Sequence, residues 1–170
     1  MKKLHLILLP CVILLFYACK PKVDIEKETE AIKVLINNET QAFLQNDTAK
    51  LLSFYIQDSY QTRLSVSPDT VGLIKGWKEL SAFFKNVNLS EISNPKNTKD
   101  FIQVKVTRNA AWAIYKDNWE YTRTAPIHLP DGRMRDTIII TTNDLFCTMN
   151  LEKKLNEWKI SSFSIYNHNN

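Results

Sequence analysis

The hydrophobic pattern of this chain changes its period once, near Asp100, and that change constrains the fold more than any other feature of the sequence. Before Asp100, apolar residues recur every three or four positions, as amphipathic helices require. After it, apolar and polar residues alternate, as in strands with one buried face. Helices followed by a run of strands favour an α+β domain in which helices cover one face of a strongly curved, mainly antiparallel sheet.

Three helices are predicted before this change. The longest is Glu28–Asn46, and its core-facing stripe consists of Ile32, Leu35, Ile36, Thr40 and Phe43. Asp47 is placed to cap a second, shorter helix, and Gly76 precedes a third, Trp77–Asn86. One strand, Tyr60–Val66, is predicted between the second and third helices.

Four strands in an antiparallel meander are predicted after the change. They are Phe101–Thr107, Ala110–Thr124, Arg135–Asn150 and Glu157–Tyr166. A polar loop around Asn94-Pro95 is expected before them, and Leu151–Asn156 is expected to form a turn. The Pro130-Asp131-Gly132 segment predicts a hairpin, because Asp-Gly accepts the positive φ angles of such a turn.

The N-terminus has the layout of a secretory signal. Two lysines precede an apolar run, Leu4–Ala18, of about fifteen residues, which is shorter than the roughly twenty that span a bilayer. Phe16–Cys19 looks like a lipobox, so we expect residues 1–18 to be removed and Cys19 to be acylated. Acyl chains on Cys19 would hold the domain on a membrane without a spanning helix. A simple signal peptide or an uncleaved anchor is the alternative.

This interpretation divides the chain into a signal of residues 1–18, a tether of residues 19–24 and one domain of residues 25–167. Lys20 after the cysteine resembles the pattern that permits outer-membrane delivery, so the expected location is the bacterial cell envelope, with a lipid anchor in the outer membrane. The mature chain would carry 20 basic and 18 acidic residues, a net charge of +2. It has no basic run, so no nucleic-acid partner is expected.

No metal or cofactor is expected. The histidines, His5, His128 and His168, are too dispersed for a ligand cluster, and the three glycines are too dispersed for a phosphate-binding loop. Cys147 is the one thiol left after removal of the signal and acylation of Cys19, so no internal disulfide is expected. Its mid-strand position predicts an inert, buried thiol.

Several short motifs occur together in a characteristic order. They are Ala42-Phe43 with Asn46-Asp47, Leu51-Leu52 with Tyr55 and Asp58, Lys75–Leu80, and Glu157–Ile160. With the order of elements, they resemble the nuclear transport factor 2-like superfamily, a cystatin-like α+β cone that includes SnoaL-like polyketide cyclases, ketosteroid isomerases and scytalone dehydratase. The resemblance covers residues 25–167. It implies a cone-shaped barrel in which three N-terminal helices pack on a curved sheet, and the concave side of that sheet lines a small-molecule pocket.

The catalytic pair of the ketosteroid isomerases is not matched. When the family's Gly-Asp is set on Asn46-Asp47, its oxyanion-binding tyrosine falls on Glu39 and its proton-shuttling aspartate falls on Arg63. An arginine is permanently protonated and cannot be that base. The resemblance therefore implies the fold without this chemistry, which favours a binding protein over an enzyme.

Asp144 is the first candidate for an acid or base, with Tyr60 as a hydrogen-bond donor. Asp144 interrupts the longest apolar strand on the face of Ile138, Ile140 and Phe146, where desolvation would raise the pKa of its carboxyl group. A bulge, an edge position or a hydrogen-bonded buried aspartate is the favoured alternative, because no partner residue is visible.

Aromatic side chains are the candidates for ligand contacts in the cone. They are Tyr55, Tyr60, Trp77, Trp112, Tyr115, Trp119 and Phe146. Strand alternation puts Tyr115, Trp119 and Tyr121 on one face and Trp112 on the other, without identifying the concave face. Core packing is the alternative for most of them.

The sequence leaves three hypotheses open. The leading one is a membrane-tethered, extracytoplasmic domain whose cone binds a small hydrophobic or aromatic ligand. The second is a SnoaL-like enzyme of the proton-transfer type, such as an isomerase, cyclase or dehydratase. The third is a homodimeric interaction module whose cone is plugged by its own aromatic side chains.

Overall fold

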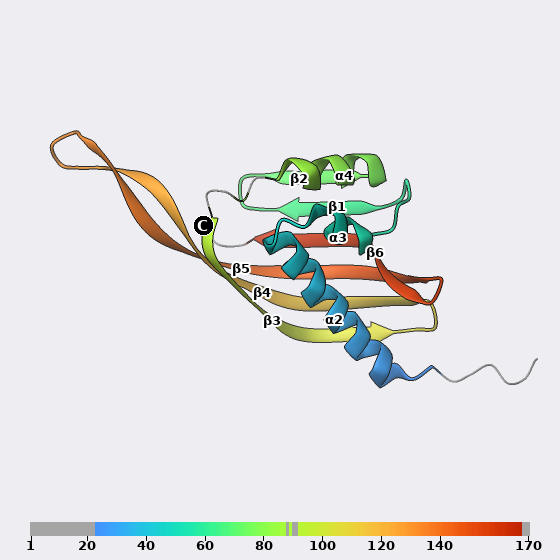
Figure 1. Ribbon diagram of the computed structural model, residues 1–170. Coiled ribbons are helices and arrows are strands. Elements are labelled where there is room, and N and C mark those ends of the chain that lie inside the picture. The colour runs from blue at the N-terminus through green and yellow to red at the C-terminus, as the bar shows by residue number, and fades with distance from the viewer. Residues whose placement is uncertain (1–22, 88, 90–91, 168–170) are drawn as a thin grey trace, which may run out of the picture.

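The computed structural model describes residues 23–87, 89 and 92–167 (Figure 1). The predicted signal, Cys19 and most of the predicted tether lie outside the described residues. In the described part of the chain, no helix is long and apolar enough to cross a membrane.

Three helices form where the periodicity predicted them: α2 (Ile25–Leu44), α3 (Thr48–Ser53) and α4 (Trp77–Asn86). Helix α2 begins three residues earlier than predicted, because the side chain of Asp24 caps it by accepting a hydrogen bond from the backbone N–H of Lys27 at 3.1 Å. The predicted cap of α3 is confirmed, since Asp47 accepts from the backbone N–H of Lys50 at 3.0 Å.

In the part of the chain that the structure describes, six strands form one sheet, in the order β2-β1-β6-β5-β4-β3. They are β1 (Thr62–Val66), β2 (Val71–Lys75), β3 (Ile92–Val106), β4 (Ala110–His128), β5 (Met134–Lys154) and β6 (Glu157–Asn167). Neighbouring strands are antiparallel except β1 and β6, which run parallel with Thr62 opposite Ser162. The four-strand meander is confirmed as β3 to β6.

The sheet differs from the prediction at its two edges. Strand β2 was not predicted, and the expected polar loop around Asn94-Pro95 is instead the first part of β3. A proline is tolerated there because β3 is an edge strand, and the register shifts between Ser93 and Lys96. The turn expected at Leu151–Asn156 is shorter, because β5 continues to Lys154 and only Leu155 and Asn156 adopt positive φ angles.

The hydrophobic core lies between α2 and the concave face of the sheet (Figure 1). Ile32 and Ile36 of α2 are fully buried, and so are Ala113 of β4, Cys147 of β5 and Ile160 of β6. Burial raises the pKa of the Cys147 thiol to about 12. The prediction of a buried thiol is confirmed.

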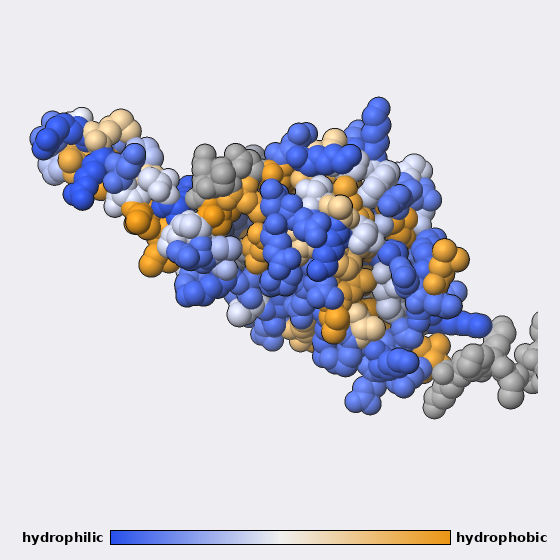
Figure 2. Space-filling model, viewed as in Figure 1, coloured by the Kyte–Doolittle hydropathy of each residue, from blue (hydrophilic) through white to orange (hydrophobic). Residues whose placement is uncertain are grey.

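Strands β4 and β5 continue beyond the rest of the sheet as a twisted, two-stranded arm (Figure 1). We call residues 124–138 the arm, because Arg123 is the last β4 residue that pairs with β3. The predicted hairpin is confirmed at its tip, where Gly132 has a φ of +81°. Figure 2 shows hydrophobic side chains at the surface where the arm leaves the body, and Ile138 is 74% exposed.

Candidate functional site

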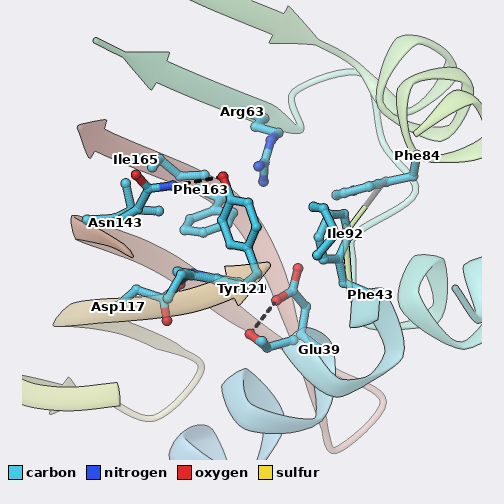
Figure 3. Close-up of a pocket in the computed structure, with 13 residues that line it drawn as sticks. Glu39, Phe43, Arg63, Phe84, Ile92, Asp117, Tyr121, Asn143, Phe163 and Ile165 are labelled. Carbon is cyan, nitrogen blue, oxygen red and sulfur yellow. Dashed lines mark hydrogen bonds between the residues drawn. The ribbon is translucent and has the colours of Figure 1, made fainter. Parts of the chain in front are cut away.

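A cavity of about 230 Å³ opens on the concave face of the sheet, between the sheet and the helices (Figure 3). Its apolar wall comes mainly from Phe43, Phe84, Trp119, Leu145, Phe163 and Ile165. Its polar wall comes from Glu39, Thr40, Arg63, Asp117, Tyr121 and Asn143. The cone is therefore not fully plugged by its own side chains, and its lining combines aromatic surface with ionisable groups.

The aromatic wall joins α2 to β4. Phe43 continues the apolar stripe of α2, and its ring meets the Trp119 ring edge-on, at 6.3 Å between centroids and 88° between planes. Trp119 shares the inward face of β4 with Tyr115, as strand alternation predicted. The concave face is thus the one that carries Tyr115, Trp119 and Tyr121.

Glu39 is a carboxyl group at a core-facing position of α2, and only 5% of the residue is exposed. It accepts hydrogen bonds from the Tyr55 hydroxyl at 2.6 Å and from the Thr40 hydroxyl at 3.3 Å. Burial raises the pKa of Glu39, while the Tyr55 hydrogen bond and the positive charge of Arg63 oppose the rise. Burial and the Glu39 charge also hold the pKa of Tyr55 well above its usual value, so its hydroxyl keeps the proton it donates.

Asp117 is a buried carboxylate of β4 whose hydrogen-bonding capacity is taken up by protein groups. It accepts from Lys99 Nζ at 2.7 Å, from Asn97 Nδ2 at 2.7 Å and from Trp119 Nε1 at 2.9 Å. The side chains of Lys99 and Asp117 are 2% and 7% exposed. This network fixes the Trp119 ring in the cavity wall.

Arg63 supplies a cation to the cavity from β1, on the side opposite Glu39 (Figure 3). The parallel pairing of β1 with β6 sets Arg63 beside Phe163, and its guanidinium carbon lies 4.8 Å from the centre of that ring. It also lies 5.4 Å from the Phe83 ring and 5.5 Å from the Phe84 ring, both on α4. Three aromatic rings therefore hold the guanidinium at the cavity wall.

A second, more open groove of about 580 Å³ lies between α2 and the turn that joins β5 to β6. Its main polar groups already have protein partners, since Glu28 accepts from Lys153 and from Trp158 Nε1, and Lys159 donates to the carbonyl of Ser53. Among the residues that the structure describes, no group of three His, Cys, Asp or Glu side chains could hold a metal ion.

Of the seven aromatic candidates, only Trp119 lines the cavity directly. Tyr55 acts from behind the wall through Glu39, and Tyr115 packs in the core against Phe101. The others lie elsewhere. Trp77 packs at the start of α4, Trp112 and Phe146 are half-buried on the opposite face of the sheet from Trp119, and the hydroxyl of Tyr60 donates to Glu152.

The acid–base candidates do not meet in the cavity. Asp144 shares a face with Ile138 and Ile140, as predicted, but this is the exposed face of β5. The burial that was expected for Asp144 is therefore absent. Tyr60 is 46% exposed, and neither Tyr60 nor Asp144 lines the cavity.

The ionisable groups of the cavity are not among the site residues predicted from the sequence. Two signals were present: Glu39 is a carboxylate beside the apolar stripe of α2, and Asp117 has the same strand parity as Tyr115. The alignment with the isomerases did land on Glu39 and Arg63, and both line the cavity.

No family model matches the sequence, and no curated protein was found as a relative. Solved structures do match. An NTF2-like family protein from Streptomyces avermitilis is 13% identical, with a TM-score of 0.62 over 84% of this chain and 97% of that chain.

Two further structures bear names that include an activity. A ketosteroid isomerase-like protein from Erwinia carotovora atroseptica is 14% identical, with a TM-score of 0.58 over 82% of this chain and 95% of that chain. A hexachlorocyclohexane dehydrochlorinase is 13% identical, with a TM-score of 0.59 over 83% of this chain and 85% of that chain. Identities this low establish the fold alone, and this chain has the α+β cone of the NTF2-like proteins.

Proposed function

We propose that this protein binds a small hydrophobic or aromatic molecule in the cavity of its cone. The observation that carries the proposal is the cavity itself: about 230 Å³ of space walled by Phe43, Phe84, Trp119 and Phe163. A soluble domain fills such apolar space with its own side chains unless the space has a use. The volume is below the roughly 300 Å³ typical of drug-sized ligands, so the ligand is small.

Calorimetric titration of the purified full-length protein with 2-naphthoate and with neutral 2-naphthamide tests this proposal. Leu145→Trp would fill the cavity from β5, and Leu155→Trp is the matched control, because Leu155 is 98% exposed at the turn after β5. At least one ligand is expected to bind the wild type and the control, and neither is expected to bind Leu145→Trp. Binding that survives Leu145→Trp, or no binding of either ligand to the wild type, would overturn the proposal.

Proton transfer is a second candidate, favoured by one observation. Glu39 is a buried carboxyl group of raised pKa on the cavity wall, and Arg63 faces it. Such a carboxylate could remove a proton next to a ketone whose oxygen is held by the guanidinium. The test is deuterium incorporation into the methyl group of 2-acetylnaphthalene, followed by NMR in heavy water. Exchange that is catalysed by the wild type and lost in Glu39→Gln would support this candidate, and exchange at the uncatalysed rate would reject it.

Tethering to a membrane through Cys19 is part of the same proposal. The support is the sequence pattern of a basic start, an apolar run too short to span a bilayer, and a cysteine after Ala18. Cys19→Ser is expected to release the protein from membranes of the producing bacterium, and Cys11→Ser is the matched control within the predicted signal. Retention of Cys19→Ser in the membrane fraction would contradict the lipid anchor.

A further inference from the structure

Arg63 is a cation at the cavity wall without a matching anion. Its side chain is half-buried among Phe83, Phe84 and Phe163, which shield it without neutralising its charge. Within residues 23–87, 89 and 92–167, no acidic side chain forms an ion pair with it. A charge that is partly removed from water gains from pairing, so an anion in the cavity would stabilise this guanidinium.

The two carboxyl groups of the same cavity already have other partners. Asp117 accepts three hydrogen bonds, including the ion pair with Lys99. Glu39 accepts from Tyr55 and Thr40, and its burial favours the neutral form. The charge of Arg63 lowers the pKa of Glu39 and of Tyr55, but neither carboxyl group forms an ion pair with the guanidinium, which can therefore also bind an anion that enters the cavity.

The chemistry of that anion follows from the guanidinium and from the walls. A guanidinium presents a planar fork of N–H donors that matches the two oxygens of a carboxylate. The rest of the wall is apolar and aromatic, so it suits a ligand whose body is a ring or a short hydrocarbon. One cation, in a cavity wall that also contains Glu39 and Asp117, suits one negative charge better than two.

Resting on the binding function proposed above, we propose that the ligand is a small organic acid with a single carboxylate and an apolar or aromatic body. The carboxylate binds Arg63, and the body lies against Phe43, Phe84 and Trp119. Arg63 is then the residue that determines specificity, and the charge of the ligand, more than its shape, separates good ligands from poor ones.

The matched pair of probes, 2-naphthoate and 2-naphthamide, tests the charge requirement, because they differ in one polar group on the same ring system. For the full-length wild type at pH 7, we expect the carboxylate to bind about tenfold more tightly or better, since a charge-assisted bidentate contact is stronger than a neutral one. Equal affinity for the two probes would overturn the charge requirement while leaving the binding function in place. No binding of either probe would reject both.

Variants at Arg63 test its role. Arg63→Met keeps a long side chain between the rings and removes the charge, and it is expected to abolish the preference for the carboxylate without loss of naphthamide binding. Arg63→Lys keeps the charge without the fork and is expected to retain part of the preference. Arg123→Met, at an exposed residue beside the arm, is the control and is expected to bind as the wild type does. A preference that persists in Arg63→Met would assign the anion site to another residue.

Discussion

The two halves of the β4–β5 ladder have the same backbone pairing and opposite surroundings. In the body, Tyr115 lies opposite Cys147, and these residues are 1% and 0% exposed. In the arm, Ile127 lies on the same face of β4 as Tyr115 and opposite Arg135 in the same unbroken register, and Ile127 is 38% exposed. The helices cover only the body half. Hydrogen bonding between strands therefore sets the shape of this hairpin, whereas the helical cover gives its side chains a low-dielectric environment.

Two ion pairs with similar N–O distances, one in the body and one in the arm, differ in the same way in their exposure to water. Asp117 and Lys99 are 2.7 Å apart in the body, and Asp131 and Arg133 are 2.6 Å apart at the tip of the arm. The first pair is nearly inaccessible to water, and the second is largely exposed. Solvent screens the second pair, so equal geometry does not mean equal stabilisation.

The largest expected effect comes from breaking the buried pair. Asp117→Ala leaves the Lys99 ammonium buried with one remaining acceptor, Asn97, and is expected to lower the free energy of unfolding by about 3–5 kcal/mol. Urea denaturation followed by circular dichroism measures this. Asp131→Ala in the arm is the control and is expected to leave the midpoint unchanged. Equal losses of unfolding free energy in the two variants would show that covering by the helices does not make the ion pair of the body stronger than that of the arm.

The pH dependence of stability reports on burial in the body. Because burial raises the pKa of Glu39, the folded state holds this proton more tightly than the unfolded chain does. The proton on Glu39 therefore stabilises the folded state. This contribution to the free energy of unfolding is complete below the ordinary pKa of 4.5 and is lost as pH rises through the raised pKa.

Glu39→Gln removes this titration, so the Tm of the wild type relative to Glu39→Gln is expected to fall from pH 4 to pH 8. Tyr55→Phe removes a hydrogen bond that lowers the pKa of Glu39, and the fall is then expected to extend to higher pH. Parallel pH profiles of the wild type and Glu39→Gln would contradict the buried-carboxyl description.

Two glycines, Gly76 in the body and Gly132 in the arm, have the same φ of +81°. A side chain at Gly76, before α4, would meet the carbonyl oxygen of Ser59 at 3.4 Å, whereas one at Gly132 would meet nothing within 4 Å. With its ψ of 156°, Gly76 has a backbone conformation that only glycine adopts readily, and Gly76→Ala is expected to cost about 1–3 kcal/mol of global stability. Gly132→Ala is expected to leave the Tm of the body unchanged, because its strain is confined to the arm tip. The same loss of Tm in both variants would tie the arm to the folding of the body.

The smallest effect is expected at the exposed apolar residues of the arm. Ile138→Ser is expected to change the free energy of unfolding by no more than about 0.5 kcal/mol, since the side chain is already in water. Denaturation at two protein concentrations is the measurement. A larger loss that grows with concentration would show that a second copy of the chain covers the arm, as the homodimer hypothesis requires.

Elements with strong periodicity were predictable, and edge strands were not. The amphipathic stripe of α2 and the Asp-Gly turn of the arm are local signals, and both hold in the structure. Strand β2 is only five residues long and contains Gly72, the start of β3 has few apolar residues, and both strands lie at sheet edges where they mostly face solvent. Their strand conformation depends on pairing with β1 and β4, which local sequence does not encode.

The sequence predicted which residues of the candidate site share a strand face. It did not predict which ionisable side chains line the cavity. Alternation correctly separated Trp119 from Trp112, but the helices decide which face becomes concave. Arg63 reaches the cavity because β1 pairs with β6, beside Phe163, and no pattern around residue 63 shows that neighbour. The site therefore depends on contacts between distant segments, and single-sequence periodicity reports only local ones.

The parallel pairing of β1 with β6 also constrains the order in which this protein can fold. Thr62 pairs with Ser162, which lies about a hundred residues later in the chain. The middle of the sheet can therefore form only after the last strand, β6, is available. Until then β1–β2 and β3–β5 are two separate pieces with open edges, and Arg63 lacks its aromatic neighbour from β6. We expect slow, late closure during refolding, and a chain that lacks the eleven residues of β6 has no native sheet to complete.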